Sequence, residues 1–170
     1  MFVQLIESIL PLNFYSELAG VIVDCSILIK IIKIYLPKIY DHLVDIGFEL
    51  SLNNVLYKWF VSLYIQNLSL DLSLTIWDVL VLEGNIVMFK SAIAILKIVK
   101  HKILSVENLE DLNDIFEDCT KHLNDNYTML YYLIARRFEF DNTYIMKNRI
   151  ALQPAIIENI NKGNEYKIQE

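Results

Sequence analysis

The chain has 170 residues, of which 55% are hydrophobic and 21% are charged, and its formal net charge is −6. This composition excludes a disordered chain, and 4 glycines and 3 prolines are too few for the turn-rich sandwiches and barrels of all-β proteins. The negative charge also argues against a nucleic-acid-binding protein, because such proteins gather lysine and arginine on one surface.

Helical periodicity begins in the first third of the chain. Residues 24–36 are predicted to form a helix with Asp24 as its N-cap, and this helix stops before Pro37. Pro37 can open the next helix because its fixed φ suits a first turn, and Gly47 ends that helix. The apolar run that starts at Met1 reads as the middle of a helix, with no capping residue before it.

Two further helices are predicted over residues 53–67 and 70–82. In the first, apolar and aromatic residues follow the helical period: Leu56, Trp59, Phe60, Leu63 and Tyr64. In the second, one apolar face comprises Leu70, Leu74, Trp77 and Val81. Ser69 is the expected N-cap of the second helix, and Gly84 is the glycine expected just after its last turn.

The helical pattern continues to the end of the chain. A helix over 86–103 ends in basic residues, which complement the negative end of the helix dipole: Lys97, Lys100, His101 and Lys102. Residues 108–123 place apolar side chains on one side and acids on the other, and two more helices are predicted over 127–137 and 142–162. The predicted fold is all-α, a bundle of about seven to eight helices.

The cysteines and the apolar stretches indicate a protein of the reducing cytosol. Cys25 and Cys119 are far apart in the sequence, which favours small apolar core residues over a disulfide or a metal knuckle. Charged residues interrupt the two most apolar stretches, 21–36 and 86–100, before either reaches the ~18 apolar residues that a membrane span needs. The first residues lack the basic region of a signal peptide.

Residue patterns typical of catalytic or metal sites are weak. His42, His101 and His122 have no second ligand at i+3 or i+4 that would make a metal site. Asp45 and Asp125 follow His42 and His122 by three residues, but this H-x-x-D spacing is common on solvated helix faces. The sequence contains no G-x-S-x-G motif and no glycine-rich phosphate loop. We therefore expect no metal and no cofactor, and the residues alone favour an interaction module or a structural domain.

The pair Arg136–Arg137 is open to two interpretations. A single arginine can stabilise phosphoryl transfer in a partner enzyme. The favoured interpretation is structural: two helix-terminal arginines that form salt bridges with neighbouring carboxylates.

The stretch "YKWFVSLYIQNLSLDLSLTIWDVLVLEG" (57–84) resembles the TBC domain of Rab GTPase-activating proteins. The resemblance rests on a W-F pair, an L-x-L turn, a helix that contains W-D, and a closing E-G: Trp59, Phe60, Trp77, Asp78, Glu83 and Gly84. Residues 10–50 are also similar to that family, and residues 146–160 resemble its closing basic helix. The similarity covers about residues 2–124.

This resemblance implies an all-helical C-terminal part of a TBC domain over 1–125, with additional helices over 126–170 packed on it. It implies a GTP-bound Rab-type small GTPase as the partner, and a cytoplasmic protein that reaches endomembranes through that GTPase. It also implies a mechanism in which an arginine finger and a glutamine finger act in trans on GTP. In the family, both fingers belong to the N-terminal half, in I-x-x-D-x-x-R and Y-x-Q motifs.

The chain departs from the family at these fingers. It has no I-x-x-D-x-x-R motif, and no arginine precedes Arg136. Tyr64 and Gln66 match Y-x-Q by letter, but they follow the W-F pair and precede Asn67 instead of glycine, so we interpret the match as chance. The expected function is that of a Rab GTPase activator represented by a C-terminal part without its fingers, lacking the N-terminal half. The alternative is an inactive TBC-like scaffold.

The signature residues are expected to be architectural. The Trp77 indole should fill the core, and Asp78 should cap or hydrogen-bond a neighbouring loop, because an unpaired buried carboxylate is costly. Glu83 and Gly84 should close the helix. A partial helical domain would also leave an apolar face uncovered, through which two copies of the chain could form a homodimer.

Overall fold

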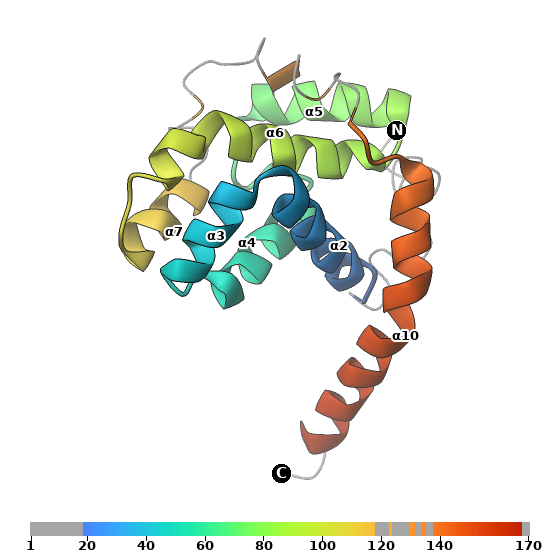
Figure 1. Ribbon diagram of the computed structural model, residues 1–170. Coiled ribbons are helices and arrows are strands. Elements are labelled where there is room, and N and C mark those ends of the chain that lie inside the picture. Colours follow the sequence, from blue (N-terminus) through green and yellow to red (C-terminus); the bar gives the residue numbers. More distant parts are fainter. Residues whose placement is uncertain (1–18, 118–122, 124–129, 132–133, 135–137, 168–170) are drawn as a thin grey trace.

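The computed structural model describes residues 19–117, 123, 130, 131, 134 and 138–167 (Figure 1). This part of the chain contains seven helices and no strand: α2 (Ala19–Tyr35), α3 (Pro37–Asp45), α4 (Glu49–Val61), α5 (Leu70–Glu83), α6 (Ile86–Ile103), α7 (Leu109–Glu117) and α10 (Asn142–Lys167). The prediction of an all-α fold is confirmed. The helix predicted over 127–137 lies largely outside the described residues, as do Cys119, His122, Arg136 and Arg137.

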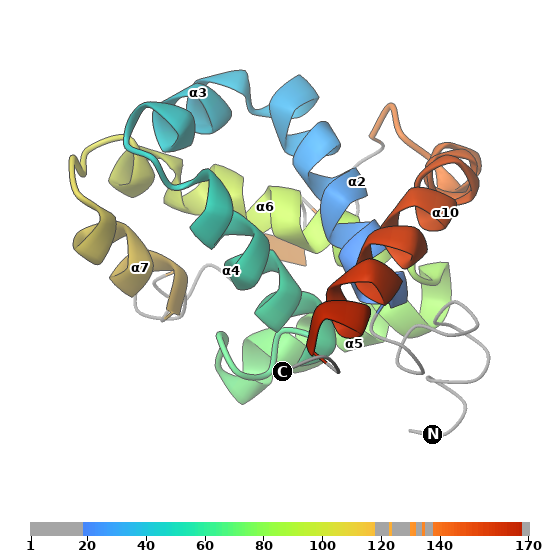
Figure 2. The same cartoon turned by 90° about the horizontal axis from the view of Figure 1, so that it is seen from below.

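Helix α6 is the most deeply buried helix of the described chain. Every residue from Ile86 to Leu96 is buried, so protein covers this part of the helix on all sides. Helices α5 and α7 contact α6, whereas α2 contacts α3, α4 and α10. Figure 1 shows α5 and α6 as one layer above α2, α3 and α4, and Figure 2 shows the same arrangement from below. None of the described helices is long and apolar enough to cross a bilayer.

Several helices begin or end at the residues predicted from the sequence. Helix α2 ends at Tyr35, and Pro37 is the first residue of α3, as predicted. Helix α6 has the predicted bounds, and Ser69 caps α5 by accepting a hydrogen bond from the Leu72 amide. The prediction that Asp24 is an N-cap is wrong, because Asp24 lies inside α2 and is buried. Its side chain is held by a residue far away in the sequence, which a local pattern does not reveal.

Helix α4 ends earlier than the pattern of buried residues predicts. It stops at Val61, and the next residues form a turn in which Leu63 and Tyr64 have positive φ angles of 49° and 70°. Both side chains are nevertheless buried. The turn therefore buries the apolar residues that a longer helix was predicted to bury, and the helical interpretation of residues 62–67 is wrong.

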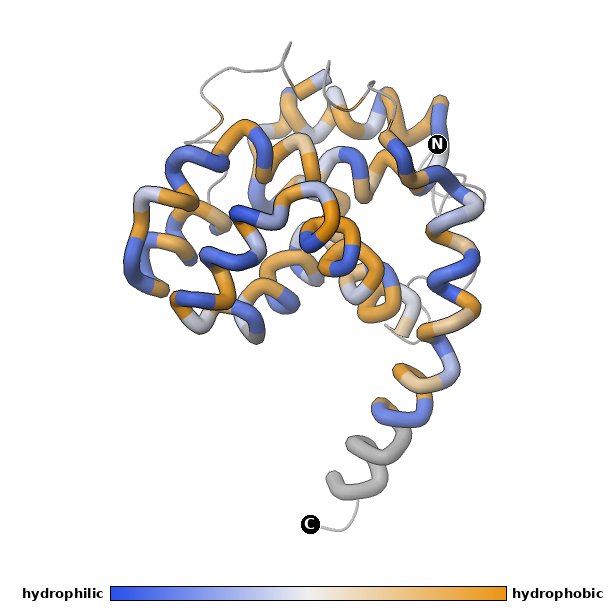
Figure 3. Tube along the Cα trace, in the orientation of Figure 1, coloured by the Kyte–Doolittle hydropathy of each residue, from blue (hydrophilic) through white to orange (hydrophobic). Residues whose placement is uncertain are grey.

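Helix α5 is apolar on two faces. Leu72, Ile76, Val79 and Leu80 are buried, and the helix packs on α6. The apolar face predicted from the sequence is instead largely solvent-exposed: Leu70 is 60% exposed, Leu74 43% and Val81 50%. Figure 3 shows hydrophobic residues along both α5 and α6. Periodicity could not select the buried face because both faces of α5 carry apolar side chains.

Helix α10 has a docked part and a projecting part. It packs against α2, changes direction along its length, and then extends away from the body of the molecule (Figures 1 and 2). Pro154 lies inside the helix, where its ring clashes with the carbonyl of the preceding turn and removes one backbone hydrogen bond. This proline accounts for the bend.

Candidate functional site

The Trp59–Phe60 pair lies at the end of α4, and both side chains are fully buried. The Phe60 ring meets the Phe89 ring of α6 edge to face, at 5.3 Å between centroids. The Trp59 ring contacts the Phe116 ring of α7 at 6.0 Å. The two aromatic residues therefore join α4 to two other helices, with the geometry in which aromatic pairs are most stable.

Trp77 fixes the turn that follows α4. Its indole is half-buried against the core, and Nε1 donates a hydrogen bond to the carbonyl oxygen of Leu63 at 3.0 Å. The hydroxyl of Tyr64 in the same turn donates to the carbonyl oxygen of Met88 on α6. Positive φ angles at non-glycine residues cost on the order of 1–2 kcal/mol each. These two hydrogen bonds, from α5 and to α6, help to hold the strained turn in place.

Glu83 and Gly84 close α5, as predicted, and Glu83 also forms an ion pair with α6. Gly84 has φ 80° and ψ −168°, and its amide donates to the carbonyl oxygen of Leu80 at 2.9 Å. The carboxylate of Glu83 accepts a hydrogen bond from the ammonium group of Lys90 on α6 at 2.6 Å. Lys90 is only 9% exposed, so Glu83 supplies the counter-charge for a nearly buried lysine.

The prediction for Asp78 is wrong. Its side chain is exposed and accepts no hydrogen bond from the part of the chain that the structure describes. A carboxylate in water needs no protein donor, so the argument from buried charge does not apply. The neighbouring indole is half-buried because residues 77 and 78 point in directions about 100° apart around the helix.

The Y-x-Q letters at 64–66 do not form a surface motif. Tyr64 is fully buried, whereas Gln66 is exposed in the turn between α4 and α5. Asn67 is buried, and its side-chain amide donates to the carbonyl oxygen of Glu117 at 3.2 Å. Of residues 64–67, Tyr64 and Asn67 are therefore part of the protein interior. The chance-match interpretation of Gln66 stays a prediction.

The principal ion pair of the described chain escaped the sequence reasoning. Arg149 on α10 donates from Nε and from an η nitrogen to the two carboxylate oxygens of Asp24 on α2, at 2.7 and 2.8 Å. The Asp24 side chain is 3% exposed and the Arg149 side chain 11%. The only signal in the sequence was a lone aspartate within the apolar run 21–29, which demands a cationic partner.

Burial affects the proton affinity of two adjacent residues on α2. Desolvation raises the pKa of the Asp24 carboxyl, while the hydrogen bonds and the charge of Arg149 act in the opposite direction. Burial, with a smaller contribution from the charge of Asp24, raises the pKa of the Cys25 thiol far above its ordinary value. The prediction that Cys25 is a core residue is confirmed, and its thiol is kept protonated and unreactive.

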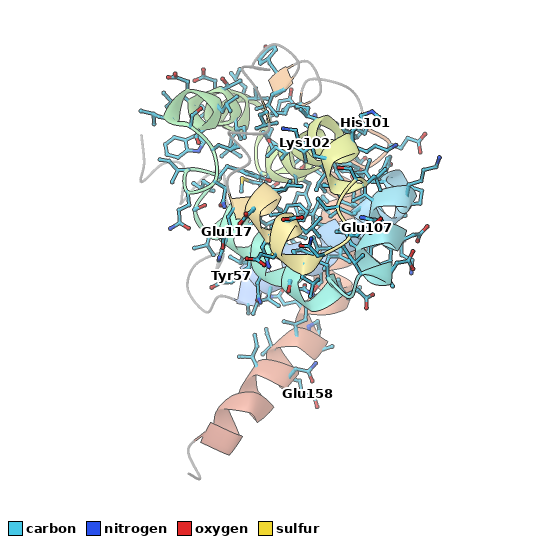
Figure 4. The ribbon with its side chains drawn as sticks, turned by 90° about the vertical axis from the view of Figure 1, so that its left-hand side faces the viewer. Tyr57, His101, Lys102, Glu107, Glu117 and Glu158 are labelled. Atoms are coloured by element: carbon cyan, nitrogen blue, oxygen red, sulfur yellow. The ribbon has the colours of Figure 1, made fainter. Side chains whose placement is uncertain are left out.

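The described histidines and acids do not converge on a metal site. No group of three or more His, Cys, Asp or Glu residues that could hold a metal ion occurs in the described part of the chain. His42 approaches the carbonyl oxygen of Val106 through Nε2 at 3.0 Å, a contact that ties α3 to the connection before α7. Figure 4 shows His101 and Lys102 at the end of α6, apart from Glu117 on α7.

Comparison with known proteins assigns the chain to a family. The family model of the Rab-GTPase-TBC domain matches residues 1–104. The GTPase-activating protein gyp2 of Schizosaccharomyces pombe is 27% identical over 124 residues, which are 73% of this chain and 17% of that protein. TBC1 domain family member 2A of Mus musculus is 29% identical over 154 residues, 90% of this chain and 16% of that protein.

Small G protein signaling modulator 3 of Rattus norvegicus is 28% identical over 131 residues, 76% of this chain and 17% of that protein. The chain therefore spans about one sixth of the length of these relatives. No solved structure matches it. The predicted boundary at residue 125 stays a prediction, since the family match ends at residue 104. Because the family model covers more than half of the chain, this protein belongs to the Rab-GTPase-TBC domain family.

Proposed function

We propose that this chain is a C-terminal part of a GTPase-activating protein for Rab-family GTPases, and that it supports catalysis without supplying the catalytic side chains. The observation that carries the proposal is how the signature residues are used. Trp59 and Phe60 are buried at the contacts of α4 with α6 and α7, and Trp77 donates to a backbone carbonyl within the protein. Trp59 and Phe60 join α4 to other helices, and Trp77 joins α5 to the turn after α4.

The sequence supports the second half of the proposal. It contains no I-x-x-D-x-x-R motif, and its three arginines are Arg136, Arg137 and Arg149. Arg149 is engaged with Asp24. An arginine finger typically contributes 10³- to 10⁵-fold to GTP hydrolysis, so a chain without one should leave the intrinsic rate of a GTPase essentially unchanged.

The test is single-turnover GTP hydrolysis by a panel of Rab-type GTPases, with and without the 170-residue chain in excess. We expect no acceleration by this chain. We expect acceleration when the same residues are part of a longer protein that carries both finger motifs. Acceleration by the chain alone, lost in Gln66→Ala or in Arg136→Ala/Arg137→Ala, would contradict the proposal and would assign a finger role to those residues.

A second candidate is an inactive TBC-like scaffold, which the absence of an I-x-x-D-x-x-R motif from the sequence favours equally. Binding separates the two candidates. A scaffold binds a GTPase in its GTP form and leaves hydrolysis unchanged even when the longer protein is assayed. An activator, in contrast, accelerates hydrolysis in that longer form.

Localisation follows from the partner in this proposal. The protein works in the cytoplasm and is peripheral to endomembranes, where membrane-bound GTPases direct vesicle trafficking. The test is microscopy of a fluorescently tagged chain: membrane recruitment should require the GTP-bound partner and disappear when that GTPase is depleted.

A further inference from the structure

Helix α5 carries an apolar seam, of which Leu70, Leu74 and Val81 are exposed and Trp77 is half-buried against the core. Its members recur at intervals of four, three and four residues, which is the spacing of the a and d positions of a heptad: Leu70, Leu74, Trp77 and Val81. Leu70, Leu74 and Val81 are 43–60% exposed, and Leu82 beside the seam is 83% exposed. We call Leu70, Leu74, Trp77 and Val81 the α5 seam. The opposite face of α5 is already buried, where the helix packs on α6.

Acidic residues flank the seam at matching positions. With Leu70 and Trp77 at d, Asp71 and Asp78 both fall at e, seven residues apart, where coiled-coil helices carry the charges that select a partner. Both are exposed, and neither carboxylate forms an ion pair with any described residue. Helix α5 has no lysine, arginine or histidine, and the carboxylate of Glu83 is already engaged by Lys90.

We propose that the α5 seam is a docking site for an amphipathic α-helix of a partner protein, whose apolar stripe is flanked by lysine or arginine. The apolar spacing selects a helix as the occupant, because knobs from a facing helix fit between residues that repeat at this interval. The two aspartates select its charge. This proposal goes beyond the proposed action on GTPases and does not rest on it.

The charge pattern argues against a second copy of the chain in this site. Two antiparallel α5 helices would set e positions against e positions, and the aspartates of one copy would face those of the other. Two parallel copies would set Asp71 and Asp78 against g positions occupied by Ser73 and Leu80, which are buried and uncharged. The homodimer predicted from the sequence therefore gains no charge complementarity from this seam.

The experiment titrates the 170-residue chain into two labelled peptides of three heptads. Both carry leucine at a and d, one carries lysine at e and g, and its twin carries glutamate there. Like charges at e and g keep each peptide from associating with itself. We expect saturable binding of the lysine peptide, with the glutamate twin weaker by roughly tenfold, since exposed ion pairs contribute modestly to affinity.

Variants test the site itself. Asp71→Lys/Asp78→Lys should invert the preference between the peptides, and Leu74→Gln/Val81→Gln should abolish binding of both. The matched control is Asp41→Lys/Asp45→Lys on α3, an exposed pair whose replacement changes the net charge equally and should leave the preference intact. All these positions are exposed, so the fold should survive, and circular dichroism checks it.

A second readout comes from the chain itself. Trp59 is buried, whereas Trp77 belongs to the seam, so tryptophan emission should shift when the lysine peptide binds and should not shift in the Leu74→Gln/Val81→Gln variant. Equal binding of both peptides, binding of neither, or inversion of the preference in the α3 control would overturn the proposal. So would a dimer in sedimentation that Leu74→Gln/Val81→Gln dissociates, because the occupant would then be a second copy.

Discussion

Arg149 and Asp24 form a two-pronged ion pair between α10 and α2, with N–O distances of 2.7 and 2.8 Å, although 125 residues separate them in the sequence. The guanidinium presents parallel N–H groups that match the two carboxylate oxygens, which makes this contact geometrically specific as well as strong. It fixes the docked part of the C-terminal helix on the body of the molecule.

Removing one partner of this ion pair should lower the free energy of unfolding, whereas replacing both partners by apolar residues should not. We expect Arg149→Met to destabilise the protein by about 3–5 kcal/mol, because it leaves the buried Asp24 carboxylate without a partner. The double variant Asp24→Leu/Arg149→Met should recover most of that loss, since apolar residues of similar size often replace buried ion pairs without penalty. Urea denaturation measures both. Equal losses of stability in the single and double variants would show that the unpaired Asp24 carboxylate is not the cause of the destabilisation.

The pH dependence of Arg149→Met follows from the same contact. Without the arginine, only burial acts on Asp24, and burial raises its pKa above the ordinary value of 3.8. The folded state then binds more protons than the unfolded state just above pH 3.8, so stability falls as pH rises through that window. Acidification from pH 7 should therefore stabilise Arg149→Met relative to Asp24→Leu/Arg149→Met. A constant difference between these variants would contradict the assignment.

Local signals in the sequence predicted much of the fold. Pro37 and Ser69 mark helix starts for reasons that involve only their near neighbours, and the bounds of α6 follow from one long apolar pattern. The Asp24–Arg149 pair could not be predicted, because no periodicity links α2 to α10. The buried face of α5 could not be predicted either, since the choice between two apolar faces depends on what α6 presents.

In the candidate site, too, the sequence predicts some features and not others. The sequence predicts an architectural role for Trp59, Phe60, Trp77, Glu83 and Gly84. Trp59 and Phe60 lie in contacts between helices, and Trp77 donates a hydrogen bond to the turn after α4. The sequence contains no hint that Glu83 neutralises Lys90, because the two residues belong to different helices. Asp78 was misplaced for a different reason. Apolar neighbours in the sequence do not imply burial, because Asp78 lies on the exposed side of its helix.

Two lysine–glutamate pairs allow a matched test of burial. Glu83→Ala should cost about 1–3 kcal/mol, because Lys90 is nearly buried and would lose the carboxylate that satisfies its charge. Glu117→Ala removes the partner of Lys58 in an exposed pair and should cost well under 1 kcal/mol. Thermal or urea unfolding of both variants provides the comparison. Equal losses would mean that Lys90 reaches water once its partner is removed.

The last prediction concerns the backbone at Gly84. Its φ of 80° with ψ of −168° belongs to a region that essentially only glycine adopts, and a Cβ built there would meet nothing within 4 Å. Any loss in Gly84→Ala therefore comes from the backbone conformation and not from a steric clash. We expect a loss of roughly 1–3 kcal/mol in unfolding free energy. Gly84→Asn should lose as much, because asparagine tolerates the left-handed helical region but not this one. Recovery of stability by asparagine would show that the chain relaxes here into an ordinary left-handed helix end.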